Sequence, residues 1–398
     1  MSSDTHPVRE SLLGRLFLAG GSIILPQAIE GGLTLTLPSG ASHRIGYERP
    51  GAACDLQVRN YRPLWSAMRR GAVGFAESYM AGDLDSSDIT AVLRFYLQNR
   101  HVLDEAAKPV FYKSLADRLF HLLRSNTKKG AKRNISEHYD LGNDFYAQWL
   151  DSTMSYSSAY YGAGANSLEA AQKAKYDLVF DGLDIGEGAH VLEIGCGWGG
   201  FAEVAADRGC KVTGITISRQ QLDYAATRLK DRAELRFEDY RDTTGTYDAI
   251  ASIEMIEAVG EAHWPDYFRT LRDRLKLGGC AAVQAITIDE SFYEGYRSTT
   301  DFIQRYIFPG GMLPTRTILA QQARLAGLKL EPLQTFGHDY ARTLALWRER
   351  FEASWSAISH LGFDDNFRRR WRYYLCYCEA GFSESAIDVG VYRFRRVE

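Results

Sequence analysis

The chain of 398 residues carries 47 basic and 50 acidic side chains, a formal net charge of −3. This balance lacks the strong positive charge typical of nucleic-acid-binding domains, so we expect no nucleic-acid partner. The length favours one large domain with a smaller one. Six scattered cysteines form no Cys-x-x-Cys pair, which argues against disulfides and a metal site and favours a reducing cytoplasm. No apolar run is long enough to span a bilayer, so any lipid contact is expected to be peripheral.

Residues 1–130 predict a small α+β domain without a catalytic signature. Its predicted elements are an amphipathic helix over 11–18, a hairpin of strands 33–37 and 43–47, and helices over 63–70 and 88–100. Segment 124–133 holds five basic residues and no acid. It fits either a solvated linker or a contact with anionic lipid headgroups. We expect this domain to dock on a membrane.

Residues 131–398 alternate predicted strands and helices. The strands fall at 189–194, 211–217, 235–237, 247–253, 280–288, 328–336 and 387–394, and a helix over 168–183 precedes them. This alternation is typical of an α/β fold with a mostly parallel sheet. The last strand is expected as an antiparallel edge. Helical inserts at about 290–325 and 341–380 are expected to form a lid and an acyl-chain pocket.

The sequence V-L-E-I-G-C-G-W-G-G over 191–200 predicts a buried strand, a glycine turn and a helix start. Gly195, Gly197 and Gly199 let the backbone approach a ligand closely. The G-x-G-x-G spacing, the preceding Glu193 and the missing phosphate-binding Lys-Ser/Thr favour S-adenosylmethionine over a dinucleotide. A plain structural turn is the alternative.

Further cofactor contacts are expected at the ends of the next two strands. Strand 211–217 ends without a ribose-binding acid, so Thr216 and Gln221 are the candidates there. Tyr240 and Arg241 follow strand 235–237 in a polar-aromatic cluster that fits an adenine. For Tyr240, ordinary packing is an equally good interpretation.

Two other segments carry candidate chemistry. Seven aromatic residues fall between 139 and 161, which fits either stabilisation of a cation or a packed lid. Glu254 and Glu257 follow strand 247–253 at its carboxyl end. Because burying a carboxylate is costly unless it is paired or useful, we expect Glu257 to be functional.

Eight motifs occur in order along the chain: H-Y-D-L-G-N-D from 138, M-S-Y-S from 154, L-E-I-G-C-G-W-G from 192, G-I-T-I-S from 214, D-Y-R-D from 239, E-A-V-G from 257, R-Y-I-F-P-G-G from 305 and F-G-H-D-Y from 336. Together they cover roughly residues 130–395. The set resembles the cyclopropane fatty acid synthase family of S-adenosylmethionine-dependent enzymes. The resemblance implies a class I methyltransferase fold, with Tyr156 and Ser157 among the cofactor residues.

The resemblance also implies methyl transfer to a cis double bond of a phospholipid acyl chain, with a mid-chain carbocation and bicarbonate as the base. The implied bicarbonate pocket comprises Ser158, Glu257, Gln284, Ile286 and Tyr340. Family members that form cyclopropanes carry Cys and His at the positions of Ser158 and Gln284. This chain departs from both, which favours a methylene- or methyl-branched product over a ring.

Cys378 matches a family cysteine that is a further catalytic candidate. Because an alkene is itself a nucleophile, we interpret Cys378 as structural. Two other functions stay open: a methyltransferase for a small amine or phenol, and a non-catalytic lipid-binding protein. We expect the chain in the cytoplasm at the inner face of a phospholipid membrane, and a homodimer stays open.

Overall fold

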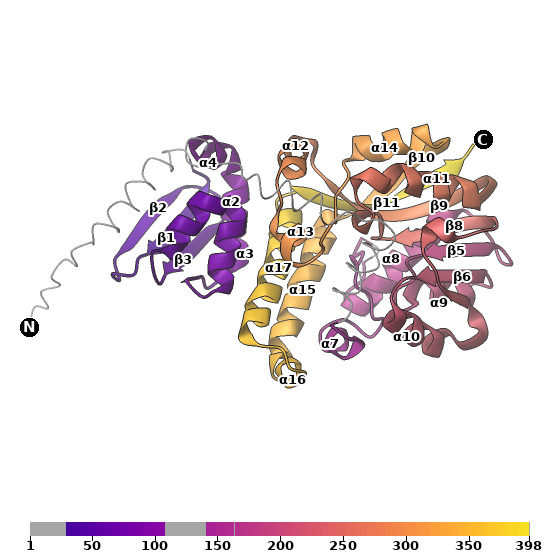
Figure 1. The fold of residues 1–398 in the computed structure, drawn as a ribbon, viewed down its shortest axis with the longest axis horizontal. Helices are drawn as coiled ribbons and strands as arrows, with labels where there is room; N and C mark the ends of the chain where they lie inside the picture. The colour runs from indigo at the N-terminus through magenta and orange to yellow at the C-terminus, as the bar shows by residue number, and fades with distance from the viewer. Residues whose placement is uncertain (1–28, 108–140, 163, 398) are drawn as a thin grey trace, which may run out of the picture. The chain divides into compact units, whose positions relative to one another are not determined.

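The computed structural model describes residues 29–107, 141–162 and 164–397 (Figure 1). They form two compact units, and the first combines the described residues before 108 with segment Phe363–Glu384. The second holds the described residues from 141 to 362 and from Ser385 onward. The sequence predicts a single domain from residue 131 onward, whereas segment 363–384 belongs to the first unit. The predicted helix at 11–18 and the basic segment 124–133 lie outside the described residues.

The first unit is an α+β fold, as predicted. Its sheet has the order β2-β1-β3-β4, formed by β1 (Gly31–Thr36), β2 (Ser42–Arg49), β3 (Ala53–Val58) and β4 (Leu84–Asp85). The predicted hairpin is confirmed by antiparallel β1 and β2, and β3 joins β1 in parallel. The helices are α2 (Arg62–Met80), α3 (Ile89–Gln98), α4 (Arg100–Ala107) and α17 (Asp365–Ser383).

The C-terminal helix α17 belongs to this unit because its buried aromatic face packs on α2 and α3. The rings of Tyr373 and Tyr79 lie 5.6 Å apart. Arg94 of α3 donates to Glu384 at 2.6 Å, immediately after α17 ends. Sequence separation hides this association, since the partners lie about three hundred residues apart in the chain.

The second unit contains a seven-stranded sheet of order β10-β11-β9-β8-β5-β6-β7. Its strands are β5 (His190–Ile194), β6 (Lys211–Thr216), β7 (Glu234–Phe237), β8 (Tyr247–Ile253), β9 (Leu275–Ile288), β10 (Leu328–Thr335) and β11 (Ile387–Arg396). Strands β5 to β9 pair in parallel. The last strand is antiparallel, as predicted, but it is not an edge. It lies between β9 and β10 and pairs antiparallel with both.

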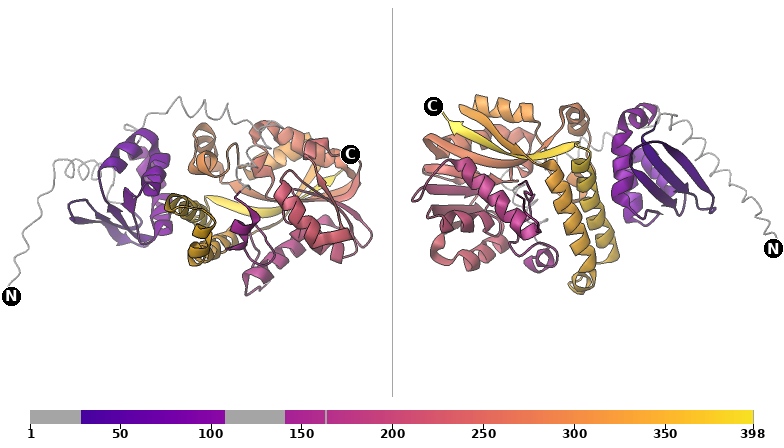
Figure 2. Two further views of the ribbon diagram at one scale, coloured as in Figure 1. Left: turned by 60° about the horizontal axis from the view of Figure 1, so that its bottom comes forward. Right: turned by 180° about the vertical axis from the view of Figure 1, so that it is seen from behind.

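Helices cover both faces of this sheet. Helix α11 lies in front of the sheet in Figure 1, and α8 covers it in the rear view of Figure 2. The α-helices of this unit are α7 (Asn143–Ala147), α8 (Leu168–Leu183), α9 (Gly200–Asp207), α10 (Arg219–Leu229), α11 (Trp264–Arg274), α12 (Glu290–Ser298), α13 (Phe302–Tyr306), α14 (Arg316–Leu325), α15 (Gly337–Ala353) and α16 (Trp355–His360). Short 3-10 turns are η1 (Lys230–Arg232), η2 (Tyr240–Asp242), η3 (Ile256–Ala258) and η4 (Glu261–His263).

Sequence and local structure agree at the helix starts that matter for the site. Ser167 caps α8 and Ser218 caps α10, each accepting a bond from a backbone N–H of the first turn. The apolar residues of β5, and those of β8 before Ile253, are almost fully buried, which fixes the sheet beneath the loops at its carboxyl edge. Within the described residues, no helix is both long and apolar enough to cross a bilayer.

Candidate active site

The glycine turn follows β5 as predicted. Gly195, Gly197 and Gly199 have φ values of 82°, 51° and 83°, a region that L side chains rarely adopt. A Cβ on Gly197 would meet no described atom within 4 Å, whereas one on Gly199 would lie 3.0 Å from Leu229. Gly197 therefore borders open space, and Gly199 allows close packing. Together they form a cradle that a side chain at position 197 would fill.

The acid before this turn is buried in the sheet. Glu193 is 3% exposed, and its Oε2 has no hydrogen-bond partner among the described residues. Burial raises the pKa of this carboxyl well above its usual value, and the nearby Lys175 ammonium partly opposes the rise. Its role as a cofactor residue stays a prediction.

The residues after β6 are tied to one another. Thr216 donates through its hydroxyl to Gln221 at 3.2 Å, and both side chains are buried. The neighbouring Gln220, which the sequence analysis did not single out, has a buried Oε1 without a partner in the described chain. An amide oriented in this way can bond a polar ligand. Gln220 therefore joins Thr216 and Gln221 as a candidate ribose contact.

Tyr240 and Arg241, which follow β7, also make contacts that stabilise the fold. Tyr240 packs edge-on against the ring of Tyr267 at 5.7 Å, and its hydroxyl has no partner within the described residues. Arg241 donates two bonds to Asp239, at 2.8 and 2.7 Å. Both interpretations of Tyr240 remain compatible with this geometry.

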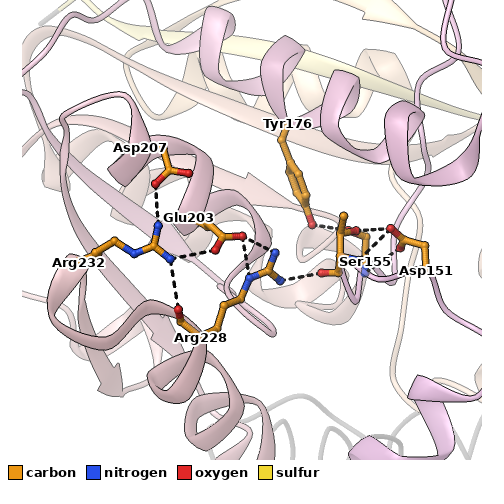
Figure 3. A network of polar contacts seen from close by, with 8 residues as sticks. Asp151, Ser155, Tyr176, Glu203, Asp207, Arg228 and Arg232 are labelled. Carbon is orange, nitrogen blue, oxygen red and sulfur yellow. Dashed lines mark hydrogen bonds and ion pairs between the residues drawn. The ribbon is translucent and has the colours of Figure 1, made fainter.

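Loop 151–158 carries three predicted site residues, and Figure 3 shows how it is held. Asp151 accepts bonds from the backbone and hydroxyl of Thr153, at 3.0 and 2.6 Å. The hydroxyls of Ser155 and Tyr176 share a bond of 2.7 Å, which ties the loop to α8. Hydrogen bonds within the second unit therefore hold loop 151–158 in place.

A second clamp reaches the loop from α10 (Figure 3). Arg228 donates to the carbonyl of Thr153 at 2.7 Å and to Glu203 of α9 at 2.6 Å. Arg232 also bonds Glu203, at 2.9 Å, but within the described residues it makes no hydrogen bond to the loop. Arg228 therefore connects the loop to the helices behind the glycine turn.

Helix α8 supplies two buried polar groups to the same loop. Lys175 donates to the hydroxyl of Ser157 at 2.5 Å, and Gln172 donates to its carbonyl at 2.9 Å. Lys175 is fully buried, and burial lowers its pKa to about 8. Glu254, Asp151 and Glu193 oppose that shift. A buried amine therefore lies near three carboxyl groups.

The predicted aromatic segment forms a cluster. Tyr156 lies 5.3 Å from Tyr146, 5.6 Å from Trp149 and 5.4 Å from Trp347 of α15, measured between ring centroids. Tyr340 extends the cluster, since its ring lies 6.0 Å from that of Trp347. This packing supplies ring faces suited to a cation, but it also supports the packed-lid interpretation.

Three residues of the implied bicarbonate pocket converge on Glu254. Its Oε1 accepts bonds from the backbone N–H of Ser158 at 2.8 Å and from Gln284 at 2.7 Å. Its Oε2 accepts a bond from the Tyr340 hydroxyl at 2.7 Å. The Ser158 hydroxyl instead bonds the carbonyl of Ala159. The predicted residues are therefore brought together, with a carboxylate of the chain itself at their centre.

Glu257 lies beside this centre but has a different environment. Its Oε1 accepts a bond from the backbone N–H of Ile286 at 2.6 Å, and its Oε2 has no partner among the described residues. Burial, together with the charge of Glu254, raises the pKa of Glu257 to about 8. Burial also raises the pKa of Glu254, but its hydrogen bonds and Lys175 oppose that rise.

The implied pocket does not fit a bound bicarbonate in this arrangement. Its donors already bond Glu254 and Glu257, and an added anion would meet these carboxyl groups. The sequence pattern places Glu254 at the end of its strand without assigning it to the site, and no local signal singles out Lys175. Cys378 lies on α17 in the first unit. Its structural role stays a prediction.

The sheet order and the open glycine cradle define the class of protein. Residues 126–392 match the family model for mycolic acid cyclopropane synthetase. The chain belongs to this family. It is an S-adenosylmethionine-dependent methyltransferase, and the glycine turn with its buried, unpartnered polar groups fits that cofactor.

Two curated relatives are similar over most of their length. Tuberculostearic acid methyltransferase UfaA1 of Mycobacterium tuberculosis is 40% identical over 345 residues, covering 81% of this chain and 78% of the relative. Cyclopropane-fatty-acyl-phospholipid synthase of Escherichia coli is 34% identical over 351 residues, covering 87% and 88%. The crystal structure of mycolic acid cyclopropane synthase CmaA1 complexed with SAH and CTAB has a TM-score of 0.63 and 27% identity, covering 66% of this chain and 98% of that chain.

Proposed function

We propose that this enzyme methylates a cis double bond in an acyl chain of a membrane phospholipid, at the cytoplasmic face of the bilayer. We further propose a methylene-branched product in preference to a cyclopropane. The family match and the names of the two relatives support a fatty acyl substrate. The site must then accept an apolar chain and remove a proton from it.

The observation that carries the proposal is the link between the aromatic cluster and a carboxylate. Tyr340 takes part in both, since its ring packs near Trp347 and its hydroxyl bonds Glu254. Aromatic faces stabilise cations, and a carboxylate can accept a proton. A carbocation formed on an alkene needs both properties in one place.

S-adenosylmethionine supplies an electrophilic methyl group at this site. When one alkene carbon has formed a bond to that methyl, the neighbouring carbon is left cationic. Loss of a methyl proton with closure between the methyl carbon and the cation gives a cyclopropane. Alternatively, a hydride shift moves the cation to the methylated carbon, and loss of a methyl proton gives a C=CH₂ branch. Conversion to a methyl branch would require a separate reductant.

The departures at two positions favour the second route. Ser158 offers its backbone N–H to Glu254 while its hydroxyl bonds Ala159, and Gln284 offers a neutral amide. A neutral donor stabilises an anion less than a charged one does. A change of about 1.4 kcal/mol between two barriers alters a product ratio tenfold, so such differences suffice to redirect the cation.

The test uses purified enzyme, vesicles of a cis-monounsaturated phospholipid, and S-adenosylmethionine with a trideuterated methyl group. Gas chromatography with mass spectrometry should find an added CD₂ unit in a chain that hydrogenates to a methyl branch. Vesicles of saturated phospholipid are the matched control and should give no product. A pure cyclopropane would contradict the product assignment. Turnover of amines or phenols without lipid turnover would contradict the substrate class.

A further inference from the structure

We propose that the Glu254 carboxylate is the enzyme's own proton acceptor and replaces a bound bicarbonate. This inference rests on the proposed alkene methylation, because only that chemistry requires a methyl proton to be removed. It assigns a catalytic role to a residue that the motif resemblance does not supply, and it leaves Glu257 a different task.

The hydrogen bonds place Glu254 where an external base would otherwise be held. Donors from three separate segments, at Ser158, Gln284 and Tyr340, meet its two oxygens within 2.7–2.8 Å. Oε1 accepts two of these bonds and Oε2 accepts one. A carboxylate oxygen has two acceptor positions, so Oε2 retains capacity for a proton.

The charges of the neighbouring groups also favour an ionised Glu254. Burial raises the pKa of Glu254, and the three hydrogen bonds and the fully buried Lys175 oppose that rise. Glu257 has one backbone donor and a pKa of about 8, so it is mainly protonated at neutral pH. Two carboxyl groups with environments this different take separate roles, and the one that accepts more hydrogen bonds is the base.

The backbone at Glu254 provides an independent observation. Its φ is 49°, in the left-handed region that a non-glycine residue rarely adopts. Its N–H still continues the sheet ladder, donating to the carbonyl of Gln284 at 2.8 Å. Strained residues of this kind persist where the surroundings fix them, and they concentrate at functional sites. Here this backbone conformation orients the Glu254 side chain toward its three hydrogen-bond donors.

The proton transfer balances without another reactant. A C–H bond of the transferred methyl breaks, and its electron pair forms the new bond to the cationic carbon. The proton moves to Glu254 Oε2, which becomes a neutral carboxylic acid. Release of that proton to solvent after the product leaves restores the anion.

The test compares wild type, Glu254→Gln and Glu254→Gly in CO₂-free buffer, with and without added bicarbonate. Wild type should give the same rate in both buffers. Glu254→Gln should lose at least about 100-fold in lipid product, the usual scale for a missing general base. Glu254→Gly suits the left-handed φ and frees the three donors, so bicarbonate or formate should restore its activity several-fold.

Glu187→Gln, at an exposed carboxylate, is the matched control and should behave as wild type. Calorimetry with S-adenosylmethionine and circular dichroism should show unchanged cofactor affinity and folding in the Glu254 variants. A wild-type rate that depends on bicarbonate, or full turnover by a folded Glu254→Gln, would overturn the role of Glu254. Absence of methylated lipid from wild type in both buffers would instead overturn the proposed function.

Discussion

The glycine turn after β5 and the carboxylate pocket after β8 lie at the same edge of one sheet, yet they are built differently. The turn is local, with three glycines within five residues and an open cradle at Gly197. The pocket is assembled from loop 151–158, β9 and α15 around Glu254. The first depends on backbone conformation and the second on side-chain hydrogen bonds and charge.

Under the proposed function, the turn serves cofactor binding and the pocket serves proton transfer. The cradle is formed by the backbone of three glycines, so its shape does not depend on the protonation of a side chain. The pocket contains two carboxyl groups and a buried lysine whose charges are coupled. Changes in the turn should therefore affect cofactor affinity, whereas changes in the pocket should affect pH dependence and product formation.

The largest effect on the binding side is expected from Gly197→Val. A branched side chain is strained at a φ of 51° and would fill the space that the glycine leaves open. We expect S-adenosylmethionine affinity to fall by about 100-fold, roughly 2.8 kcal/mol. Isothermal titration calorimetry measures this, with circular dichroism as the folding control. Unchanged affinity in a folded variant would show that the cofactor does not use this cradle.

The pocket side can be tested by pH, with Glu257→Gln as the probe. The folded-state pKa of Glu257 is raised to about 8 by burial and by Glu254, against an ordinary value of 4.5. A raised pKa stabilises the fold fully below the unfolded value, and that stabilisation is lost as pH rises through the folded value. The wild type should thus lose stability between about pH 4.5 and 8, by at most about 1.4 kcal/mol per pH unit.

Glutamine mimics the protonated acid and lacks this loss. The Tm of Glu257→Gln relative to wild type should therefore rise across that window by several degrees, since about 1 kcal/mol corresponds to 2–4 °C in a domain of this size. Melting curves of both proteins between pH 5 and 9 measure the difference, and the exposed Glu187→Gln serves as control. A constant difference across pH would show that Glu257 stays ionised when folded.

The same contrast explains what the sequence could predict. Strand and helix patterns, and the glycine spacing after β5, are local, so the sequence predicts the seven strands and the glycine turn within a few residues. The neighbours of Glu254 lie 30 to 96 residues away in sequence. Its left-handed φ has no local signature either. Motif resemblance identified Ser158, Gln284 and Tyr340, but only their geometry shows the carboxylate that they share.

The position of β11 and α17 was equally beyond local patterns. The insertion of β11 between β9 and β10 depends on which strand leaves a gap, and strand propensity does not encode that order. The association of α17 with the N-terminal helices depends on aromatic contacts such as Tyr373 with Tyr79. Both placements result from tertiary packing, which local sequence patterns do not predict.

The smallest expected effect lies where the two regions are joined, at Arg228. It bonds Glu203 behind the cofactor turn and the Thr153 carbonyl in the loop that carries Ser158 (Figure 3). Arg228→Met keeps much of the side-chain volume but removes the two bonds to Glu203 and the one to Thr153, each worth about 1.5–3 kcal/mol at most for a charged donor. We expect a three- to tenfold fall in kcat, about 1 kcal/mol in barrier, with little change in cofactor affinity.

Arg232→Met is the matched control, since Arg232 bonds the same Glu203 but not the loop. Steady-state kinetics on unsaturated vesicles compare the two variants, and equal losses in both would mean that the ion pairs with Glu203, and not the hold on the loop, account for the effect.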